Sequence, residues 1–290
     1  MATETNLIKT TDLADAQVRE MAFTELFTEN LRKLIEALGV TRKIAKQAGS
    51  VLKTYKATGT LASGTVAEGE VIPLSKYKMK VVNYGEITLE KWRKATTAEA
   101  IIGSGFNQAV TLTTDRMMKD IQNNTRTKFF TFLGTGTGAS TGVGLQATLA
   151  QTWGQLQTLF EDNAIEAVYF INPLDIADYL ATATITTQTA FGMTYIENFL
   201  GMGTVFMNSS VPKGKVYATA KDNLVLYYIP VNGADLGNAF SFTSDELGLI
   251  GIHEDSDYKT MTCEDVIVSG LTLFAEMISG VVVGTITASA

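Results

Sequence analysis

The feature that most constrains this chain is a long helix-forming stretch, residues 97–133, which ends at Gly134. From about Ser104 its apolar side chains recur three, four or seven positions apart, which is typical of a helix with one apolar face. Those side chains are Phe106, Ala109, Val110, Met117, Ile121 and Phe132. A helix of about 30 residues is about 45 Å long, well beyond the average globular helix of about 10–14 residues. We therefore expect other elements to pack along it.

The size and composition of the chain are those of an ordinary folded protein. It has 290 residues, of which 46% are hydrophobic and 18% are charged. This length suits one large domain or two lobes that share a core. A single cysteine, Cys263, excludes an internal disulfide, and the first residues lack the basic and then apolar pattern of a signal peptide. We therefore expect a cytoplasmic protein.

One apolar stretch near the C-terminus, residues 266–286, is long enough to suggest a membrane span. It carries Glu276 in its middle and has no Lys or Arg at either end, which argues against insertion. We interpret it as buried strands and predict no contact with a membrane.

The net charge of −7 is distributed unevenly along the chain. Residues 1–138 hold 19 Lys and Arg against 14 Asp and Glu, giving +5, whereas residues 139–290 hold 4 against 16, giving −12. Halves of opposite charge could attract each other between copies of the chain, although two solvated surfaces on one monomer would give the same count. An acidic protein is a poor candidate for coating nucleic acid.

The N-terminal third combines a helix with a basic segment. Apolar residues at helical spacing predict a helix over residues 12–38, stopped by Gly39. A basic run follows, with no Asp or Glu between Val40 and Ala67. Such a run is typical of a solvated arm or one that faces a partner, with contact to nucleic acid as the weaker alternative.

Residues 57–95 change to the period of a β-strand. Apolar side chains alternate with lysines around Tyr77 and Met79, and again near Leu89, on either side of a predicted turn at residues 83–85. This pattern predicts a long two-stranded hairpin. An isolated hairpin has no second layer to bury its apolar face, so we expect it to lie on another surface, of its own chain or of a neighbour.

A glycine cluster, residues 134–144, follows the long helix. It has no Lys-Ser or Lys-Thr pair and does not follow a strand, so it lacks the features of a phosphate-binding loop. We interpret it as a flexible connector. The segments beyond it predict a compact α/β lobe. They are helices at residues 145–160 and 173–180, and strands at 167–171, 204–207, 215–219 and 223–231. After the lobe, the chain finishes in further strands near residues 249–252 and from 266 onward.

The sequence contains no group of residues that indicates catalysis. His253 is the only histidine, so with Cys263 it cannot complete an ordinary zinc site, and we interpret it as part of a solvated turn. The neighbouring carboxylates could bind a hard cation weakly but lack the spacing of a calcium loop. Acid–base pairs could be drawn from Asp175 with Asp178 or from Glu264 with Asp265, but spacing alone assigns them no role. We predict no catalytic residue, no cofactor and no metal site.

The order of these segments resembles that of the major capsid proteins of tailed bacteriophages, whose fold is called the Hong Kong 97 type. The resemblance covers nearly the whole chain and is carried by the order of its parts more than by any single motif. The matching stretches are FFTFLGTGTGASTGVG (129–144), YFINPLDIADYL (169–180), GTVFMNSSVPKGKV (203–216) and LFAEMISGVVVGTI (273–286).

The resemblance implies an α+β fold in five parts. They are an N-terminal arm (residues 1–56), an extended β-hairpin loop (57–95), a spine helix with the peripheral domain (96–144, the helix itself at 97–133), an α/β axial domain (145–240) and return strands of the peripheral domain (241–290).

The resemblance also implies a non-enzymatic shell subunit that forms pentamers and hexamers, with each extended loop lying across a neighbour. Implied partners are other copies of the chain, a portal protein and packaged double-stranded DNA bound without sequence-specific contact. The implied location is the virion capsid, assembled in the cytoplasm of the host bacterium. The candidates for inter-subunit contact are the hairpin lysines Lys76, Lys78 and Lys80 and the basic arm residues Arg42, Lys43 and Lys46.

Two departures from the family limit what the resemblance implies. Only about fifty residues precede the hairpin, too few for the large scaffold segment of some members, so we expect a separate scaffolding protein. Some members cross-link lysine to asparagine, but nothing here identifies the acceptor asparagine or the catalytic glutamate, so we predict no cross-link and no ladder on a denaturing gel.

Two alternative functions remain open. One is the shell of an encapsulin-like bacterial nanocompartment, whose fold resembles the same family but which packages enzymes. The other is a cytosolic enzyme that binds a nucleotide at the glycine cluster. Loss of nucleotide binding on replacing Gly136 and Gly138 would favour the enzyme.

Overall fold

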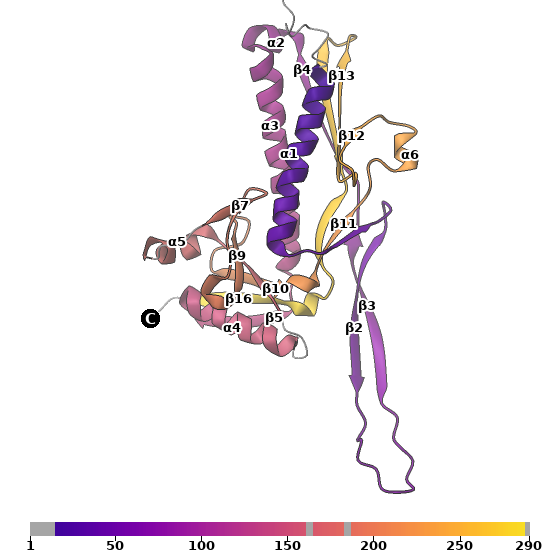
Figure 1. The fold of residues 1–290 in the computed structure, drawn as a ribbon, viewed down its shortest axis with the longest axis vertical. Coiled ribbons are helices and arrows are strands. Elements are labelled where there is room, and N and C mark those ends of the chain that lie inside the picture. The colour runs from indigo at the N-terminus through magenta and orange to yellow at the C-terminus, as the bar shows by residue number, and fades with distance from the viewer. Residues whose placement is uncertain (1–14, 161–164, 183–186, 288–290) are drawn as a thin grey trace, which may run out of the picture.

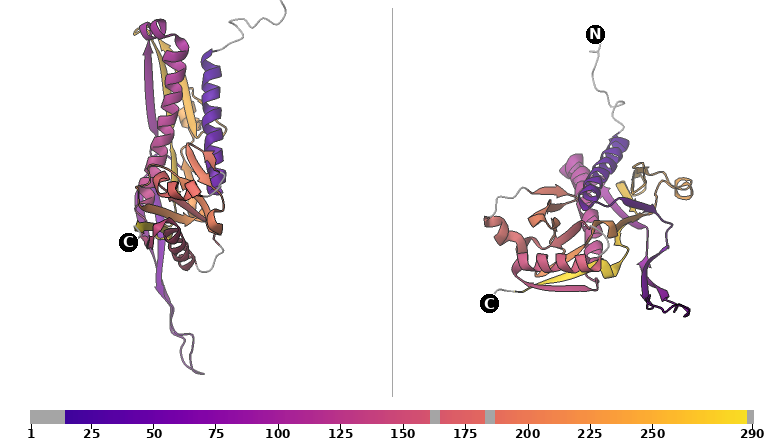
Figure 2. Two further views of the ribbon diagram at one scale, coloured as in Figure 1. Left: turned by 90° about the vertical axis from the view of Figure 1, so that its left-hand side faces the viewer. Right: turned by 60° about the horizontal axis from the view of Figure 1, so that its bottom comes forward.

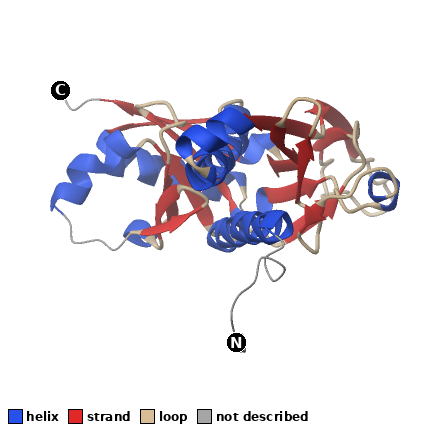
Figure 3. Cartoon of the chain, turned by 90° about the horizontal axis from the view of Figure 1, so that it is seen from above, coloured by secondary structure: helices blue, strands red, loops and turns tan. Residues whose placement is uncertain are grey.

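The computed structural model describes residues 15–160, 165–182 and 187–287 (Figure 1). The molecule is elongated, with long helices and an antiparallel sheet at one end and an α/β lobe at the other. A narrow hairpin projects beyond the lobe. Seen from above, strands lie on both sides of the central helices (Figure 3).

The predicted long helix is present but is not continuous. It consists of α2 (Ala98–Ser104), a π-helical turn (Asn107–Thr111) and α3 (Leu112–Leu133). The break falls at Gly105, whose φ of 81° is open to glycine but costly for other residues. The face of α3 that includes Ile121, Phe129 and Phe130 is buried, so the predicted one-sided packing is confirmed for this segment.

The predicted N-terminal helix is α1 (Asp15–Leu38). It ends in a Schellman motif, in which the Gly39 amide donates to the Glu36 carbonyl and the Val40 amide donates to the Ile35 carbonyl, both at 3.0 Å. Gly39 takes the positive φ of 67° that this motif needs. The side chains that α1 buries against the core follow a helical spacing: Phe23, Phe27, Leu31, Leu34 and Leu38.

Beside these helices lies an antiparallel sheet in the order β12 (Thr243–Ser244), β13 (Ile250–Asp257), β14 (Thr262–Ser269) and β4 (Glu90–Thr97). A smaller sheet joins β1 (Arg42–Ala45), β11 (Leu224–Tyr228) and β15 (Leu271–Ala275). His253 lies within β13, so its interpretation as part of a turn was wrong.

The α/β lobe is built on a seven-stranded mixed sheet. Its strand order is β5 (Gly138–Val143), β16 (Val281–Thr287), β10 (Lys215–Ala220), β6 (Ala167–Ile171), β9 (Gly203–Met207), β8 (Met193–Ile196) and β7 (Gln188–Ala190). Its helices are α4 (Gly144–Leu159) and α5 (Pro173–Thr182), while the short α6 (Ala234–Gly237) lies in the loop before β12. The predicted strand at residues 167–171 is confirmed with its bounds and is buried throughout.

The glycine cluster is not a flexible connector, and that interpretation was wrong. Residues 138–143 form the edge strand β5, which pairs in parallel with β16. A Cβ atom on Gly142 would lie 2.4 Å from the backbone nitrogen of Thr148 in α4. Gly142 therefore allows strand and helix to approach each other closely, while Gly136 and Gly138 lie against Val281 and Val282 at β16.

This close approach gives a stability prediction. Gly142→Ala should destabilise the fold by about 1–3 kcal/mol, because helix α4 must shift to admit the methyl group. Gly154→Ala, within α4, has no atom within 4 Å of the added Cβ and should stabilise the helix by up to about 1 kcal/mol. Denaturant unfolding of both variants measures the difference, and equal midpoints would contradict the predicted contact.

The hairpin is formed by β2 (Val51–Thr60) and β3 (Lys76–Glu86), which pair antiparallel. The predicted hairpin is confirmed in type, but its predicted turn at residues 83–85 was wrong, because these residues lie inside β3. The chain reverses instead between residues 60 and 76. The segment after residue 85, predicted as the second strand of a hairpin ending at residue 95, instead leads into β4 (Glu90–Thr97), which belongs to the sheet beside α3.

Aromatic side chains join the two ends of the molecule. Phe129 and Phe130 of α3 lie with ring centroids 5.4 and 5.3 Å from that of Phe170 in β6. The turn between β7 and β8 inserts Phe191 against Phe27 of α1, at 5.5 Å. Both ends therefore share one core, as the length of the chain led us to expect.

Candidate assembly surfaces

The hairpin projects from the molecule with two chemically different faces, and Figure 2 shows it standing clear of the other elements. On β3, Tyr77, Met79 and Val81 are 63%, 66% and 47% exposed. Because side chains alternate along a strand, the lysines of β3 lie on the opposite face, and Lys76, Lys78 and Lys80 are all exposed. Soluble monomers rarely expose a continuous apolar strip of this kind, so this face is a candidate contact surface.

The base of the hairpin, in contrast, is firmly anchored. Leu52 and Ile87 are buried in a small cluster with Val225 and Phe274. The Gly49 amide donates to the Ile87 carbonyl at 2.9 Å, and the Ile87 amide donates to the Ser50 carbonyl at 3.0 Å. The hairpin is thus held at its base while its strands and tip remain open to solvent.

The three basic arm candidates lie on or beside β1 and do not meet the hairpin lysines. Arg42 pairs with Glu276 at 2.7 Å and donates to the Asp222 carbonyl at 2.8 Å. The Lys46 ammonium lies 5.2 Å from the centre of the Tyr227 ring. Lys43 is exposed. The structure therefore gives Arg42 and Lys46 partners within their own chain, and a contact of any of the three with another subunit stays a prediction.

An apolar groove of about 450 Å³ lies on the sheet that contains β4, β13 and β14. Among its lining residues are Leu89, Phe240, Phe242, Val266 and Val268. The segment from Asp222 to Tyr258, which forms one side of the groove, contains no Lys or Arg. The groove thus has a largely apolar lining, to which Lys91 and His253 also contribute, beside a segment that carries no positive charge.

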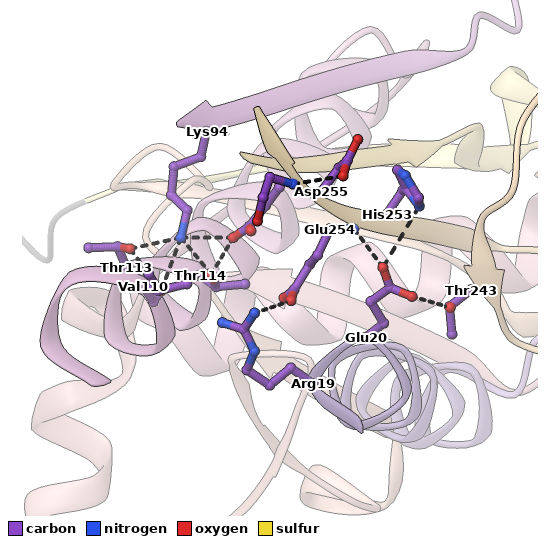
Figure 4. Close-up of polar contacts among 12 residues, drawn as sticks. Arg19, Glu20, Lys94, Val110, Thr113, Thr114, Thr243, His253, Glu254 and Asp255 are labelled. Carbon is purple, nitrogen blue, oxygen red and sulfur yellow. Dashed lines mark hydrogen bonds and ion pairs between the residues drawn. The ribbon is translucent and has the colours of Figure 1, made fainter. Parts of the chain in front are cut away.

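A buried polar cluster joins α1 to this sheet (Figure 4). Arg19 pairs with Glu254 of β13. Glu20 accepts the backbone N–H of Glu254 at 2.5 Å and also the Thr243 hydroxyl. The Glu20 and Glu254 side chains are almost fully buried and that of Arg19 is largely buried, so α1 carries two charged side chains, Arg19 and Glu20, toward the interior.

The second part of the cluster ties the sheet to α3. Asp265 of β14 is fully buried. It accepts a 2.8 Å ion pair from Lys94 of β4 and a 2.6 Å hydrogen bond from the Thr114 hydroxyl of α3. Lys94 also contacts the Thr114 hydroxyl at 2.6 Å. Helix α3, which comes from the predicted spine, is thereby fixed to the sheet by polar as well as apolar contacts.

Burial changes the protonation of this cluster. Desolvation raises the pKa of Glu254 to about 7, with Arg19 opposing the shift and Asp265 and Glu20 adding to it. Burial also raises the pKa of the Cys263 thiol, and Asp265 adds to that shift. Cys263 is therefore kept in its neutral, unreactive form.

The carboxylates that the sequence offered as acid–base pairs have different contacts in the structure. Glu264 pairs with Arg93 on the outer face of β14, while its neighbour Asp265 points inward. Asp175 accepts the backbone N–H of Gly214 at 2.8 Å, and the Asp178 side chain lies outside the described residues. His253 lies with Nδ1 3.9 Å from Glu20 Oε1. Glu264 and Asp265 therefore lie on opposite faces of β14 and do not face each other.

In the described ranges no group of three or more His, Cys, Asp or Glu residues is placed to hold a metal ion. Over the same residues, no helix has both the length and the apolar character needed to cross a membrane.

Comparison with known proteins identifies the fold. No family model and no curated protein matches the sequence. Among solved structures, a chain of the cyanophage A-1(L) capsid asymmetric unit has a TM-score of 0.56 at 15% identity, covering 99% of this chain and 100% of that one. A chain from Mycobacterium phage Patience has a TM-score of 0.52 at 8% identity, covering 100% and 95%. A chain of the holo-SrpI encapsulin complex from Synechococcus elongatus PCC 7942 has a TM-score of 0.50 at 11% identity, covering 89% and 90%.

These similarities extend over nearly the whole chain at very low sequence identity. The chain therefore has the Hong Kong 97 type capsid fold, an α+β architecture, and the prediction made from the order of its segments is confirmed.

Proposed function

We propose that this chain is a structural major capsid protein, which self-assembles as pentamers and hexamers into an icosahedral shell around a phage genome. The observation that carries the proposal is the projecting hairpin with its exposed apolar strip, in a chain that has a capsid fold. The chain acts by association and performs no covalent chemistry in this proposal.

The shape of the molecule suggests how copies associate. The hairpin of β2 and β3 points away from the sheet that contains β12 and β13 (Figure 1). A contact between the hairpin of one copy and that sheet of a neighbour would therefore use two different surfaces of the chain. Such a heterologous contact generates a closed ring when the rotation closes. The apolar groove beside β14 offers a surface of matching apolar character for the strip of Tyr77, Met79 and Val81.

We adjust the proposed division into domains to the observed sheets. The arm (1–56) includes a helix packed on the core, and the extended loop is best confined to β2, β3 and the residues between them. Strand β16, assigned from the sequence to the peripheral return strands (241–290), lies within the seven-stranded sheet, so we place residues 281–287 in the axial domain together with β5.

The same proposal includes partners beyond the chain itself. We propose a separate scaffolding protein, a portal protein at one vertex and packaged double-stranded DNA held without sequence-specific contact, with assembly in the cytoplasm of the host bacterium. The acidic net charge of the chain is consistent with enclosing DNA without coating it.

A second candidate is the shell of an encapsulin-like nanocompartment. The observation that favours it is the similarity to the SrpI encapsulin, which covers 89% of this chain. The contents of the particle isolated from its source distinguish the two functions. A phage head contains DNA, whereas a nanocompartment contains a cargo enzyme.

Electron microscopy with size-exclusion chromatography tests the proposal. The full chain is purified after expression alone and after coexpression with its candidate scaffold. We expect closed particles, or rings of five and six subunits, in at least one condition, and well-formed shells from the chain alone would remove the need for a separate scaffold. A uniform monomer or dimer in both conditions would contradict the proposed function.

A further inference from the structure

Three charged side chains form a row across the sheet beneath helix α1. The strand register places Glu254 of β13 opposite Asp265 of β14, and Asp265 opposite Lys94 of β4. Directly opposed side chains of neighbouring strands have Cβ atoms about 4.5–5.5 Å apart, so like charges there repel each other. The pairing of the sheet thus forces two carboxyl groups together on its buried face.

Helix α1 adds a third carboxyl group and a second cation to this row. Arg19 pairs with Glu254, and Glu20 approaches the same residue closely enough to accept its backbone N–H. With every group ionised, the cluster contains three carboxylates (Glu20, Glu254, Asp265) and two cations (Arg19, Lys94). One excess negative charge is therefore buried between α1 and the sheet, and one added proton makes the cluster neutral.

The two halves of α1 depend on this cluster to different degrees. In the C-terminal half, Phe27, Leu31 and Leu34 are fully buried in the main core. The N-terminal half is held by Phe23 and by the charged cluster, beside a groove of about 130 Å³ between α1 and α3. The attachment of this half to the sheet is therefore sensitive to the charge of the cluster.

We propose that Arg19, Glu20, Glu254 and Asp265 form a proton-dependent latch, which holds the N-terminal half of α1 on the sheet and weakens when the cluster loses its proton. Released residues of α1 would expose Phe23 and the groove beside it. The latch is a property of a single chain, so it does not rest on the proposed shell function.

The direction of the pH response follows from the protonation of Glu254. Its pKa lies near 7 with α1 docked, against 4.5 for the ordinary side chain. Docking is therefore strongest below the ordinary pKa and is progressively lost as pH rises through 7. The other groups facing the site are Arg19 and Glu20 on α1, Asp265 and Cys263 on β14, Lys94 on β4 and Asp115 on α3, with His253 beside Glu20.

Hydrogen–deuterium exchange of the full-length chain, read by mass spectrometry from pH 5.5 to 8.5, tests the latch. After correction for intrinsic exchange, protection of residues 19–26 should fall by at least about tenfold over this range. The reason is that the uptake of one proton changes the docking equilibrium by up to about tenfold per pH unit. Protection of residues 31–38 should stay constant. Light scattering at each pH confirms that the assembly state is unchanged.

Two variants assign the response to the cluster. Glu254→Gln removes the excess charge without changing shape, so residues 19–26 should remain protected up to pH 8.5. Glu29→Gln changes an exposed carboxylate on the same helix and should keep the response of the parent chain. Equal protection of residues 19–26 at all pH values in the parent chain would overturn the proposal. A pH response in Glu254→Gln that matches that of the parent chain would also overturn it.

Discussion

Replacing Tyr77, Met79 and Val81 together by serine should give a folded subunit that no longer forms shells or rings. These side chains are about half or more exposed in the single chain, so their loss removes little from its core. Across an interface, burying each such side chain stabilises a contact by about 1.5–3 kcal/mol. Because every subunit repeats the contact around the shell, the losses accumulate and assembly fails.

Size-exclusion chromatography and electron microscopy measure this loss, and the melting temperature checks that the subunit remains folded. The matched control is Lys76, Lys78 and Lys80 to glutamine on the opposite face of the same strand. Because charge affects the rate of encounter more than the strength of a packed contact, this control should slow assembly and reduce its salt dependence without abolishing it. Normal shells from the serine variant would show that the apolar strip is not a contact.

The largest effect on stability is expected for Asp265→Ala. Asp265 is fully buried and holds both Lys94 and Thr114, so its removal leaves the Lys94 ammonium unpaired in the interior. Breaking a buried ion pair in this way costs about 3–5 kcal/mol. The loss should appear as a large fall in the denaturant midpoint.

Glu264→Ala is the matched control, one residue away on the outer face of β14. Its partner Arg93 has a side chain that is 65% exposed, so this ion pair contributes only about 0–1 kcal/mol. A comparable loss of stability in the two variants would mean that the inward and outward faces of β14 have been assigned wrongly.

The helices and buried strands could be predicted from the sequence because local pattern and burial agree. Helix α1 shows a one-sided apolar spacing that is interrupted only at Gly39. Strand β6 is an unbroken apolar run, typical of a strand covered on both faces. In α1 the period of the apolar residues identifies the helix and its buried face, and in β6 the unbroken apolar run identifies a strand buried on both faces.

The hairpin shows where local pattern misleads. The alternation around Tyr77 and around Leu89 suggests two strands on either side of residues 83–85. The true partner of β3 is β2, which has few apolar residues and therefore gives a weak signal. Strand β5 was missed for a related reason, because Gly138 and Gly142 satisfy close contacts, with β16 and α4 respectively, that only the folded chain reveals.

The charged cluster could not be predicted from the sequence. Arg19 and Glu254 are 235 residues apart, and no local period connects them. The run Val266, Ile267, Val268 is apolar at every position, so it does not indicate which face of β14 is buried. Asp265 and Glu264 consequently look alike until the sheet is paired.

The position of β16 has a consequence for how the chain is made. This strand lies between β5 and β10, so it supplies the hydrogen-bonding partner of both. A nascent chain that stops before residue 281 leaves β5 without a neighbour and β10 with an open edge. Such a fragment cannot complete the lobe and is exposed to aggregation and degradation during synthesis. We therefore expect interrupted translation products to be kept out of any assembly that requires the finished lobe.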